Sequence, residues 1–268
     1  MSKARLLIPT WRALRLGEHL CTGALLGAGV AVLGRLAVPR PRLAHLAVWW
    51  HRRLCRCLGV AVSCQGTAAA GALLAVNHVS WLDIPVLGSR APVHFVSKAE
   101  VRRWPVVGWL AQLAGTLFLH RGAHQAADLA REIADQLRAG RRVAIFPEGT
   151  TGDGRTLLRF HARLFAAAHG SEVPVQPVAI RYGRGAEPDT VAPFIGDDTL
   201  LAHLGRVLRH PELTVTLTFL PPVMVPNGRR RALADAVRAA IDAELGRLGS
   251  GTAAASGAQP AAFAPDTA

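Results

Sequence analysis

Leu73-Leu-Ala-Val-Asn-His-Val-Ser-Trp-Leu-Asp-Ile84 is the stretch that decides how this chain folds. It begins with a short apolar run typical of a buried strand, and that run ends abruptly at Asn77-His78. Asp83 follows five residues after His78. Residues at that separation lie ~140° apart on one helix and on opposite faces of one strand, so these two side chains can meet only across a turn. We therefore predict a strand that ends near Asn77, a turn at His78, and a helix that begins at Asp83.

The pairing of His78 with Asp83 would make a general base. A carboxylate in the first turn of a helix is favoured by the helix dipole, and it can accept the N–H of one imidazole nitrogen. The other imidazole nitrogen is then free to take a proton from a substrate. A histidine and an aspartate in an ordinary loop have the same spacing, so these two residues alone leave the catalytic interpretation open.

Strand-like and helix-like segments alternate from residue 73 to residue 248. We expect strands at 73–77, 93–98, 116–120, 142–147, 175–182 and 213–220, and helices at 83–88, 99–113, 125–139, 157–169, 199–209 and 229–248. Strands separated by helices predict an α/β domain, here 59–248, with a mixed, mainly parallel sheet flanked by helices. The last segment, 249–268, is poor in large apolar residues and is predicted to be a disordered tail.

The first 58 residues have a different composition. Leu20 to Gly34 carries no charge, but 15 helical residues reach only ~22 Å against a hydrocarbon core of ~30 Å. Pro39-Arg40-Pro41 then ends that helix, and 43–58 combines tryptophans with arginines as interfacial helices do. We expect residues 1–58 to form a basic segment and a membrane-associated helical hairpin that dips into one bilayer or barely spans it. A buried helix pair of a soluble domain is the alternative.

The chain has a net charge of +13 and a mean hydropathy of +0.24, and the positive charge indicates a negatively charged binding partner. Such a charge indicates nucleic acid, an anionic membrane surface or a phosphorylated substrate. Because the basic residues cluster beside apolar helices and no nucleic-acid-binding motif is present, we expect an anionic membrane surface and no nucleic acid. The four cysteines lack the spacing of a zinc site, so we expect free thiols in a reducing compartment and no metal.

Two further stretches place ligand-binding residue types directly after apolar strands. Gly115-Thr-Leu-Phe-Leu-His-Arg121 puts Arg121 at the end of a strand, where it could hold a phosphate by paired hydrogen bonds. Phe146-Pro-Glu-Gly-Thr150 delivers Glu148 at a turn, where Gly149 lets the backbone approach a ligand closely. Thr150 can cap the next segment or donate its hydroxyl. A surface arginine and a capping acid are the plainer interpretations of these stretches.

The segment 98–109 is basic and aromatic. It contains Lys98-Ala-Glu100, Trp104-Pro105 and Gly108-Trp109. These side chains could line an acyl pocket or touch lipid, and the tryptophans could equally pack in a core. Farther on, Val173-Pro-Val-Gln-Pro-Val178 is an apolar strand with two prolines, as in a sheet edge.

In this order, the stretches resemble the lysophospholipid acyltransferase family, whose type is 1-acyl-glycerol-3-phosphate acyltransferase. His78-x4-Asp83 matches the first block of the family, and 115–121, 146–150 and 173–178 match the second, third and fourth blocks. Lys98-x-Glu100 and Pro105-x-x-Gly108 also fit. The resemblance covers residues 43–225 by order and spacing.

The resemblance implies an O-acyltransferase of lipid biosynthesis. It would move a fatty acyl group from acyl-CoA or acyl-carrier protein to the free hydroxyl of a lysophospholipid, with no further cofactor. 1-Acyl-sn-glycerol 3-phosphate is the favoured acceptor and lyso-ornithine lipid is the alternative. The predicted location is the cytoplasmic (bacterial inner) membrane, with the active site facing the cytoplasm.

The family also implies roles for the site residues. His78 would deprotonate the acceptor hydroxyl, and Asp83 would orient His78. The alkoxide would then attack the thioester directly, in agreement with the absence of a Gly-x-Ser-x-Gly elbow and of a cysteine near His78. The predicted substrate-binding residues are Arg121, Glu148, Gly149, Thr150, Asn77 and Lys98. A metal-dependent hydrolase using the same acids would need further ligands, which the sequence does not supply at recognisable spacing.

One position departs from the family pattern. Many members place an arginine directly after the threonine of the third block, whereas this chain has Thr151, followed by Gly-Asp-Gly-Arg155. This version resembles a bacterial subset that includes acyltransferases of lyso-ornithine lipids. We therefore expect the acyl-transfer chemistry more firmly than a phosphate-bearing acceptor.

Overall fold

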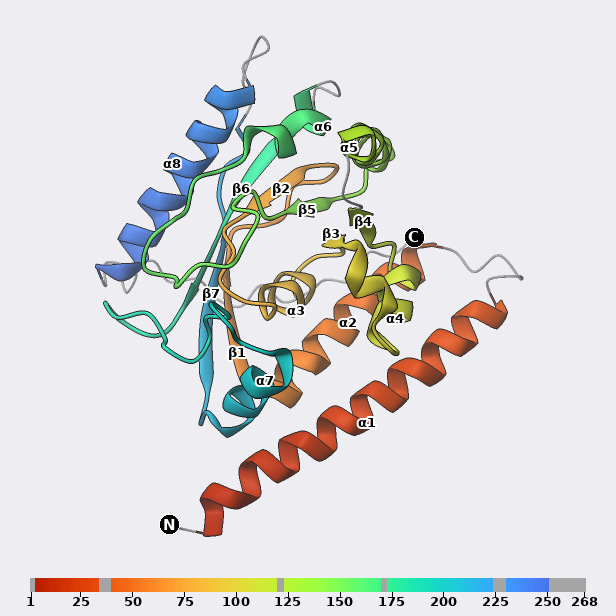
Figure 1. Cartoon of the computed structure of the whole chain (residues 1–268), viewed down its shortest axis with the longest axis vertical. Helices are drawn as coiled ribbons and strands as arrows, with labels where there is room; N and C mark the ends of the chain where they lie inside the picture. The colour runs from red at the N-terminus through yellow and green to blue at the C-terminus, as the bar shows by residue number, and fades with distance from the viewer. Residues whose placement is uncertain (1–2, 34–39, 120–122, 170–172, 224–229, 251–268) are drawn as a thin grey trace.

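A computed structural model describes residues 3–33, 40–119, 123–169, 173–223 and 230–250 (Figure 1). Within these ranges the domain is built on a seven-stranded sheet with the order β1-β7-β6-β2-β5-β3-β4. The strands are β1 Val60–Gln65, β2 Leu73–Val76, β3 His94–Lys98, β4 Leu117–Leu119, β5 Val143–Ile145, β6 Val175–Tyr182 and β7 Leu213–Phe219. Only β6 and β7 pair antiparallel, so the predicted mixed, mainly parallel sheet is confirmed.

Helices cover both faces of the sheet (Figure 1). After the N-terminal pair they are α3 Asp83–Gly88, η2 Ala99–Arg103, α4 Val107–Leu113, α5 Ala123–Arg138, η3 Ala162–Phe165, α6 Ala166–His169, α7 Leu200–Arg209 and α8 Arg230–Gly249. Side chains alternate across β2, since Leu74 and Val76 join one apolar core while Leu73 and Ala75 join the other. The first core includes residues of α2, α3 and α7, and the second includes residues of α5 and α8. All four residues of β2 are buried, as in a central parallel strand.

Three of the predicted elements differ from the structure. The sequence reasoning missed β1, an edge strand whose side chains are mostly not fully buried. The helix expected at 99–113 is interrupted by Trp104-Pro105-Val106, which separate η2 from α4. The helix expected at 157–169 is wrong for its first five residues, because the backbone N–H groups of Leu158 and His161 bond to Glu148 and Pro147 instead of to a helix. The tail at 251–268 lies outside the described residues.

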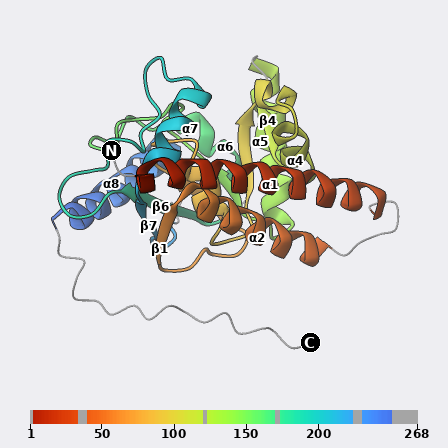
Figure 2. The same cartoon turned by 90° about the horizontal axis from the view of Figure 1, so that it is seen from below.

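The N-terminal pair of helices packs along the domain. Helix α1 Lys3–Leu33 is longer than predicted, and α2 Arg40–Leu58 follows it. Residues 8–33 of α1 are long and apolar enough to cross a membrane by length and composition, with a mean hydropathy of 1.5. Yet α1 contacts the rest of the protein at both ends of this stretch: Arg12 donates to the Pro211 carbonyl (2.7 Å), and a side chain at Gly27 would collide with the ring of Trp109. Helix α1 thus lies across the underside of the domain (Figure 2).

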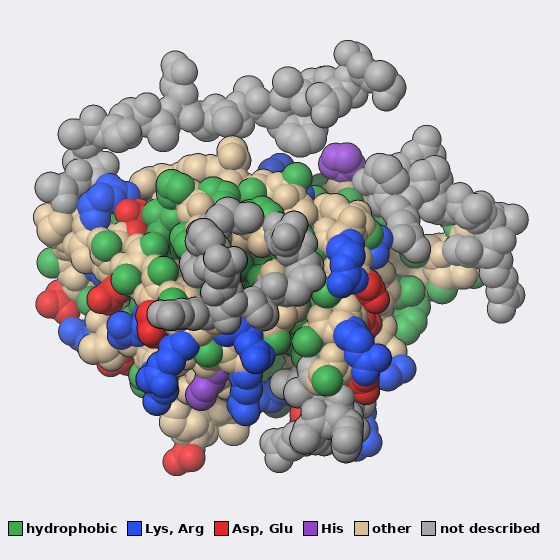
Figure 3. Space-filling model, turned by 90° about the horizontal axis from the view of Figure 1, so that it is seen from above, with side chains coloured by type: hydrophobic (Ala, Val, Ile, Leu, Met, Phe, Trp, Pro, Cys, Tyr) green, Lys and Arg blue, Asp and Glu red, His purple; other side chains and the backbone are tan. Residues whose placement is uncertain are grey.

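The surface of the molecule carries both basic side chains and exposed apolar side chains. On the face seen from above, Lys and Arg side chains are more frequent than Asp and Glu side chains, in keeping with the net charge (Figure 3). On α1, the large side chains of Trp11, Leu14, Leu25 and Val32 are each more than 60% exposed. A long apolar row left uncovered on a surface helix marks an interaction site.

Candidate active site

The turn after β2 is fixed by Asn77. Its side-chain Nδ2 donates to the Ile180 carbonyl (2.9 Å), and its Oδ1 accepts the Ile180 N–H (2.7 Å). Asn77 therefore continues the bonding between β2 and β6 through its side chain, and it is almost fully buried. We had expected Asn77 to bind substrate, but the structure engages both of its polar atoms with the β6 backbone.

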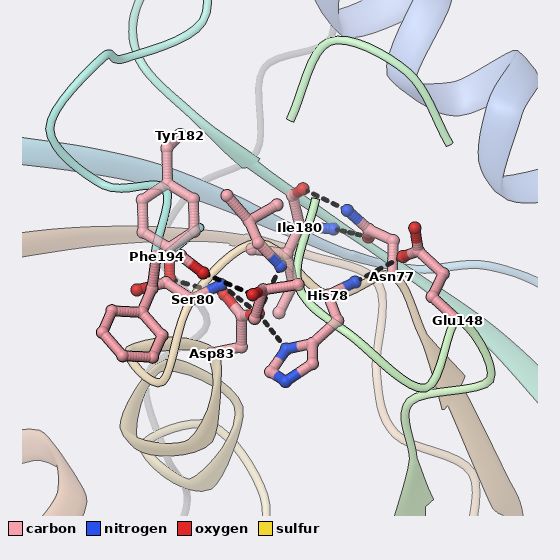
Figure 4. Close-up of polar contacts among 10 residues, drawn as sticks. Asn77, His78, Ser80, Asp83, Glu148, Ile180, Tyr182 and Phe194 are labelled. Atoms are coloured by element: carbon pink, nitrogen blue, oxygen red, sulfur yellow. Dashed lines mark hydrogen bonds and ion pairs between the residues drawn. The ribbon is translucent and has the colours of Figure 1, made fainter. Parts of the chain in front are cut away.

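His78 and Asp83 meet across the turn, as their spacing predicts (Figure 4). His78 Nδ1 lies 2.8 Å from Asp83 Oδ2, with Asp83 at the first residue of α3. The Asp83 side chain is fully buried and the His78 side chain is 19% exposed. Because an ionised carboxylate only accepts, this contact puts the imidazole proton on Nδ1 and leaves Nε2 with a free lone pair. Phe146 stacks on the imidazole at a centroid distance of 4.0 Å, which holds the plane of the ring.

The Asp83 carboxylate is surrounded by donors. Besides His78, its Oδ2 accepts the backbone N–H groups of Val79 (2.8 Å) and Ser80 (2.9 Å). Its Oδ1 accepts the hydroxyl of Tyr182 at 2.8 Å. Burial, together with the nearby charge of Asp83, raises the pKa of Tyr182 well above its ordinary value, so the hydroxyl keeps its proton and donates it. These contacts compensate for burying the carboxylate and fix its orientation.

Glu148 ties two loops to this turn. Its Oε1 accepts the His78 N–H (2.7 Å) and its Oε2 accepts the Leu158 N–H (2.9 Å). Burial raises the pKa of Glu148, and these two backbone N–H groups oppose that shift. We had expected Glu148 to hold the acceptor's polar head, whereas both of its oxygens are used on the backbone. The arrangement makes Glu148 a residue that positions His78.

Of the other predicted substrate-binding residues, the structure describes Gly149, Thr150 and Lys98. Gly149 has φ +72°, a left-handed conformation that the turn requires, and it faces the His161 ring. Thr150 is exposed. Lys98 is exposed at the carboxyl end of β3, separated from β2 by β5. Arg121 lies outside the described residues.

A second loop closes over the turn, and sequence reasoning missed it. The Phe194 N–H donates to the Val79 carbonyl (3.0 Å), and the Gly152 N–H donates to the His78 carbonyl (2.8 Å). The Thr151 hydroxyl in turn donates to the Phe194 carbonyl. A small pocket opens beside these contacts, and its lining residues are Asn77, His78, Val79, Glu148, Gly152, Gly154, Thr156, Leu157 and Leu245. Among the residues that the structure describes, no group of three His, Cys, Asp or Glu side chains could hold a metal ion.

The arrangement can do general-base chemistry. Since Nε2 of His78 is free and the imidazole is fixed by Asp83 and Phe146, a hydroxyl that reaches Nε2 can lose its proton there. Tyr182 is the functional residue that sequence reasoning missed. It is the only tyrosine in the chain, and it ends a strand that runs parallel to β2, but only the register of that pairing brings it to Asp83.

Comparison with known proteins gives concordant matches. A family model described as Acyltransferase matches residues 59–181. A lyso-ornithine lipid O-acyltransferase of Pseudomonas aeruginosa is 46% identical over 244 residues, which cover 90% of this chain and 93% of that protein. A protein of the same description from Brucella abortus is 38% identical and covers 75% of this chain and 83% of that protein. A 1-acyl-sn-glycerol-3-phosphate acyltransferase of Neisseria gonorrhoeae is 36% identical over 56% of this chain and 59% of that protein.

A solved structure has the same fold. The crystal structure of the 1-acyl-sn-glycerophosphate acyltransferase of Thermotoga maritima aligns with a TM-score of 0.68 over 91% of this chain and 96% of that chain. The two sequences are 21% identical, so this likeness speaks for the fold alone.

Proposed function

Since this chain belongs to the acyltransferase family and is an O-acyltransferase of lysolipids, we propose that lyso-ornithine lipid is its acceptor. The observation that carries this proposal is the 46% identity, over 90% of the chain, with a curated lyso-ornithine lipid O-acyltransferase. The sequence reasoning predicted the acyltransferase activity correctly. It favoured 1-acyl-sn-glycerol 3-phosphate as the acceptor, and the proposal adopts the alternative that it named.

The position after the third block supports an acceptor without phosphate. Many family members have an arginine there, and this chain has Thr151, whose hydroxyl is used on the Phe194 carbonyl. The position therefore offers neither a charge nor a free donor to a phosphate. The nearest following cation, Arg155, pairs with Glu187 at 3.1 Å on the surface. An ornithine headgroup carries a carboxylate and an ammonium in place of phosphate, so it does not depend on an arginine at this position.

In the proposed reaction His78 acts as the general base. Nε2 takes the proton of the acceptor hydroxyl as its oxygen forms a bond to the thioester carbonyl carbon. The tetrahedral intermediate then collapses, the carbon–sulfur bond breaks, and the proton on Nε2 passes to the departing thiolate. Asp83 and Glu148 do not touch the reacting atoms. Asp83 holds the imidazole through Nδ1, and Glu148 holds the backbone of His78. We propose acyl-CoA or acyl-carrier protein as the thioester donor.

The protein is membrane-associated, and we propose that α1 lies in the plane of the membrane and does not cross it. Arg12 bonds to carbonyls at the end of α7, and Gly27 packs on Trp109, so both ends of the apolar stretch are held against the domain. The exposed row of Trp11, Leu14, Leu25 and Val32 then faces lipid.

Because the proposed donors are cytoplasmic, the active site belongs on the cytoplasmic face of the cytoplasmic membrane. Protease cleavage of inside-out vesicles but not of right-side-out vesicles would agree with this orientation.

Acceptor preference tests the proposed function. With labelled acyl-CoA or acyl-carrier protein as donor, we expect kcat/KM for lyso-ornithine lipid to exceed that for lysophosphatidate by about tenfold or more, because Thr151 stands where many family members have an arginine that a phosphate could bind. Initial rates are measured with each acceptor in the same vesicles. An equal or higher kcat/KM for lysophosphatidate would contradict the proposed acceptor and leave the family activity intact.

Replacing Tyr182 with Phe tests the support of Asp83. The change removes one hydrogen bond to a buried carboxylate and adds nothing, so we expect kcat to fall by about tenfold. The KM for the acceptor should stay unchanged because the hydroxyl touches Asp83 and not the substrate. Steady-state rates are taken below the melting temperature of the variant. A kcat within about twofold of wild type, or an effect on KM alone, would show that Tyr182 does not act through Asp83.

A further inference from the structure

A second apolar surface lies on the segment between β3 and β4. Within residues 104–113, five large apolar side chains are exposed, namely Trp104 at 42%, Val106 at 38%, Val107 at 43%, Trp109 at 36% and Leu113 at 37%. We call these five residues the α4 patch. Core packing, one of the three interpretations of the sequence, therefore does not describe the two tryptophans. Five such side chains within ten residues are more than the scattered exposure that a soluble surface normally shows.

The backbone of this segment adopts a strained conformation at Val106, within the patch. Val106 has φ +60° and ψ −57°, and the Val107 N–H donates to the Pro105 carbonyl at 2.6 Å. This is a γ-turn of the rare, strained kind, and a β-branched residue is a poor occupant of it. Strained turns of this sort persist where they serve a function, such as a binding surface. Here the turn directs Val106 and Val107 to the outside of the protein.

The segment that carries the α4 patch packs against α1. Gly27 of α1 packs against the Trp109 ring and Leu110, and no side chain would fit between them. The exposed Leu25 and Val32 lie two and five residues from Gly27. At ~100° per residue, their side chains point away from the side of α1 that packs on α4. In both views α4 lies beside the C-terminal half of α1 (Figures 1 and 2). The α4 patch therefore lies beside the helix that we propose to face lipid.

Basic side chains lie next to the α4 patch, as do the carboxyl ends of the strands, where the active site is. Lys98, Arg102 and Arg103 are exposed just before it, against a single acid in 98–103, Glu100. Such a basic margin beside exposed tryptophans fits an anionic lipid surface. Lys98 ends β3, and His78 follows the end of β2. Both strands run parallel to β5, so their carboxyl ends lie on the same side of the sheet. The segment that leads to the patch therefore starts on the side of the sheet where His78 lies.

From these observations we propose that the α4 patch is a second membrane-inserting element, whose partner is the surface of an anionic bilayer. Together with α1 it would hold the carboxyl ends of the strands, where His78 lies, toward the lipid. An acceptor would then reach His78 from the membrane. This inference rests on the proposed function for the identity of the acceptor, and on the exposure of the patch and its basic margin for the membrane contact.

The test uses the full chain, its Val107→Asp variant and the matched variant Leu201→Asp. Both substitutions place a carboxylate in the first turn of a helix, where the helix dipole favours it, so both proteins should fold. Leu201 lies on α7, outside the patch, and is 80% exposed. Binding is measured by flotation with vesicles of phosphatidylcholine and phosphatidylglycerol. Activity is measured on lyso-ornithine lipid in those vesicles and on the same lipid dispersed in detergent.

We expect Val107→Asp to lower vesicle binding, and the rate on vesicle-embedded acceptor, by about tenfold, since a valine that would enter the lipid is exchanged for a charge. Its rate on dispersed acceptor should stay within about twofold of wild type, and Leu201→Asp should change neither quantity by more than that. Unchanged binding by Val107→Asp would overturn the inference. So would an equal loss on dispersed acceptor, which would place the valine in the substrate pocket. If wild type acylates neither preparation of the acceptor, the proposed acceptor fails, while the flotation result still decides the membrane contact.

Discussion

Replacing His78 with Ala is expected to lower the rate of acyl transfer by about 10³-fold or more. The reason is that the free Nε2 of His78 is the group positioned to take the acceptor's proton, and alanine leaves only water in its place. The fold should survive, because the imidazole is partly exposed and its contacts with Asp83 and Phe146 lie at the end of a turn that backbone bonds also hold. Initial rates on vesicle-embedded acceptor, at equal amounts of bound protein, measure the effect.

His161→Ala is the matched control for this change. His161 is an exposed histidine in the loop that faces Gly149, and its ring is not part of the dyad. Its loss should leave the rate within about threefold of wild type, as expected for a surface substitution away from the reacting atoms. A His78→Ala protein that keeps more than a tenth of the wild-type rate would show that another group removes the proton.

Replacing Asp83 with Asn is expected to lower the rate by about 10³-fold to 10⁴-fold. The amide has the shape of the carboxylate, but one of its two heteroatoms is a donor. The present site directs four donors at Asp83, from His78, Val79, Ser80 and Tyr182. Asparagine can satisfy them only in part. If its NH₂ group faces His78, the imidazole must switch tautomer and place its proton on Nε2, where it blocks general-base catalysis.

Asp189→Asn separates this catalytic effect from lost stability. Asp189 also accepts two backbone N–H groups, those of Val191 and Ala192, at 2.7 and 2.8 Å, and it does not touch the dyad. Both variants should lose some thermal stability because a backbone N–H loses a charged acceptor. Only Asp83→Asn should lose activity out of proportion to its melting temperature. Equal activity losses in the two folded variants would mean that Asp83 serves the fold and not His78.

Much of the site's centre could be predicted because its signals are local. The apolar run of β2, its abrupt end and the position of Asp83 all lie within twelve residues, 73–84, and one turn fixes their geometry. The supporting contacts could not be predicted in the same way. Tyr182 and Glu148 are 99 and 70 residues from the groups that they bind, and only the order and register of the strands bring them there.

At the rim of the site, two predicted substrate-binding side chains bond to the backbone. Glu148 and Asn77 have the residue types of ligand-binding groups, and sequence alone cannot tell whether a substrate or the backbone uses their polar atoms. In the fold, buried backbone N–H and C=O groups near the turn need partners, and these two side chains supply them. The strand β1 was missed for a related reason. It pairs with β7, which is far along the chain, and its own side chains are only partly buried.

The fate of a labelled acyl group tests the central claim most directly. Wild type and His78→Ala are incubated with labelled thioester donor and vesicles that contain lyso-ornithine lipid, and the products are identified by mass spectrometry. We predict that the label appears as an ester on the lipid hydroxyl with wild type, and that this product is about 10³-fold weaker with His78→Ala at equal membrane binding. Equal ester formation by the two proteins, or label released by wild type only as free fatty acid, would contradict a His78-dependent transfer to the lipid.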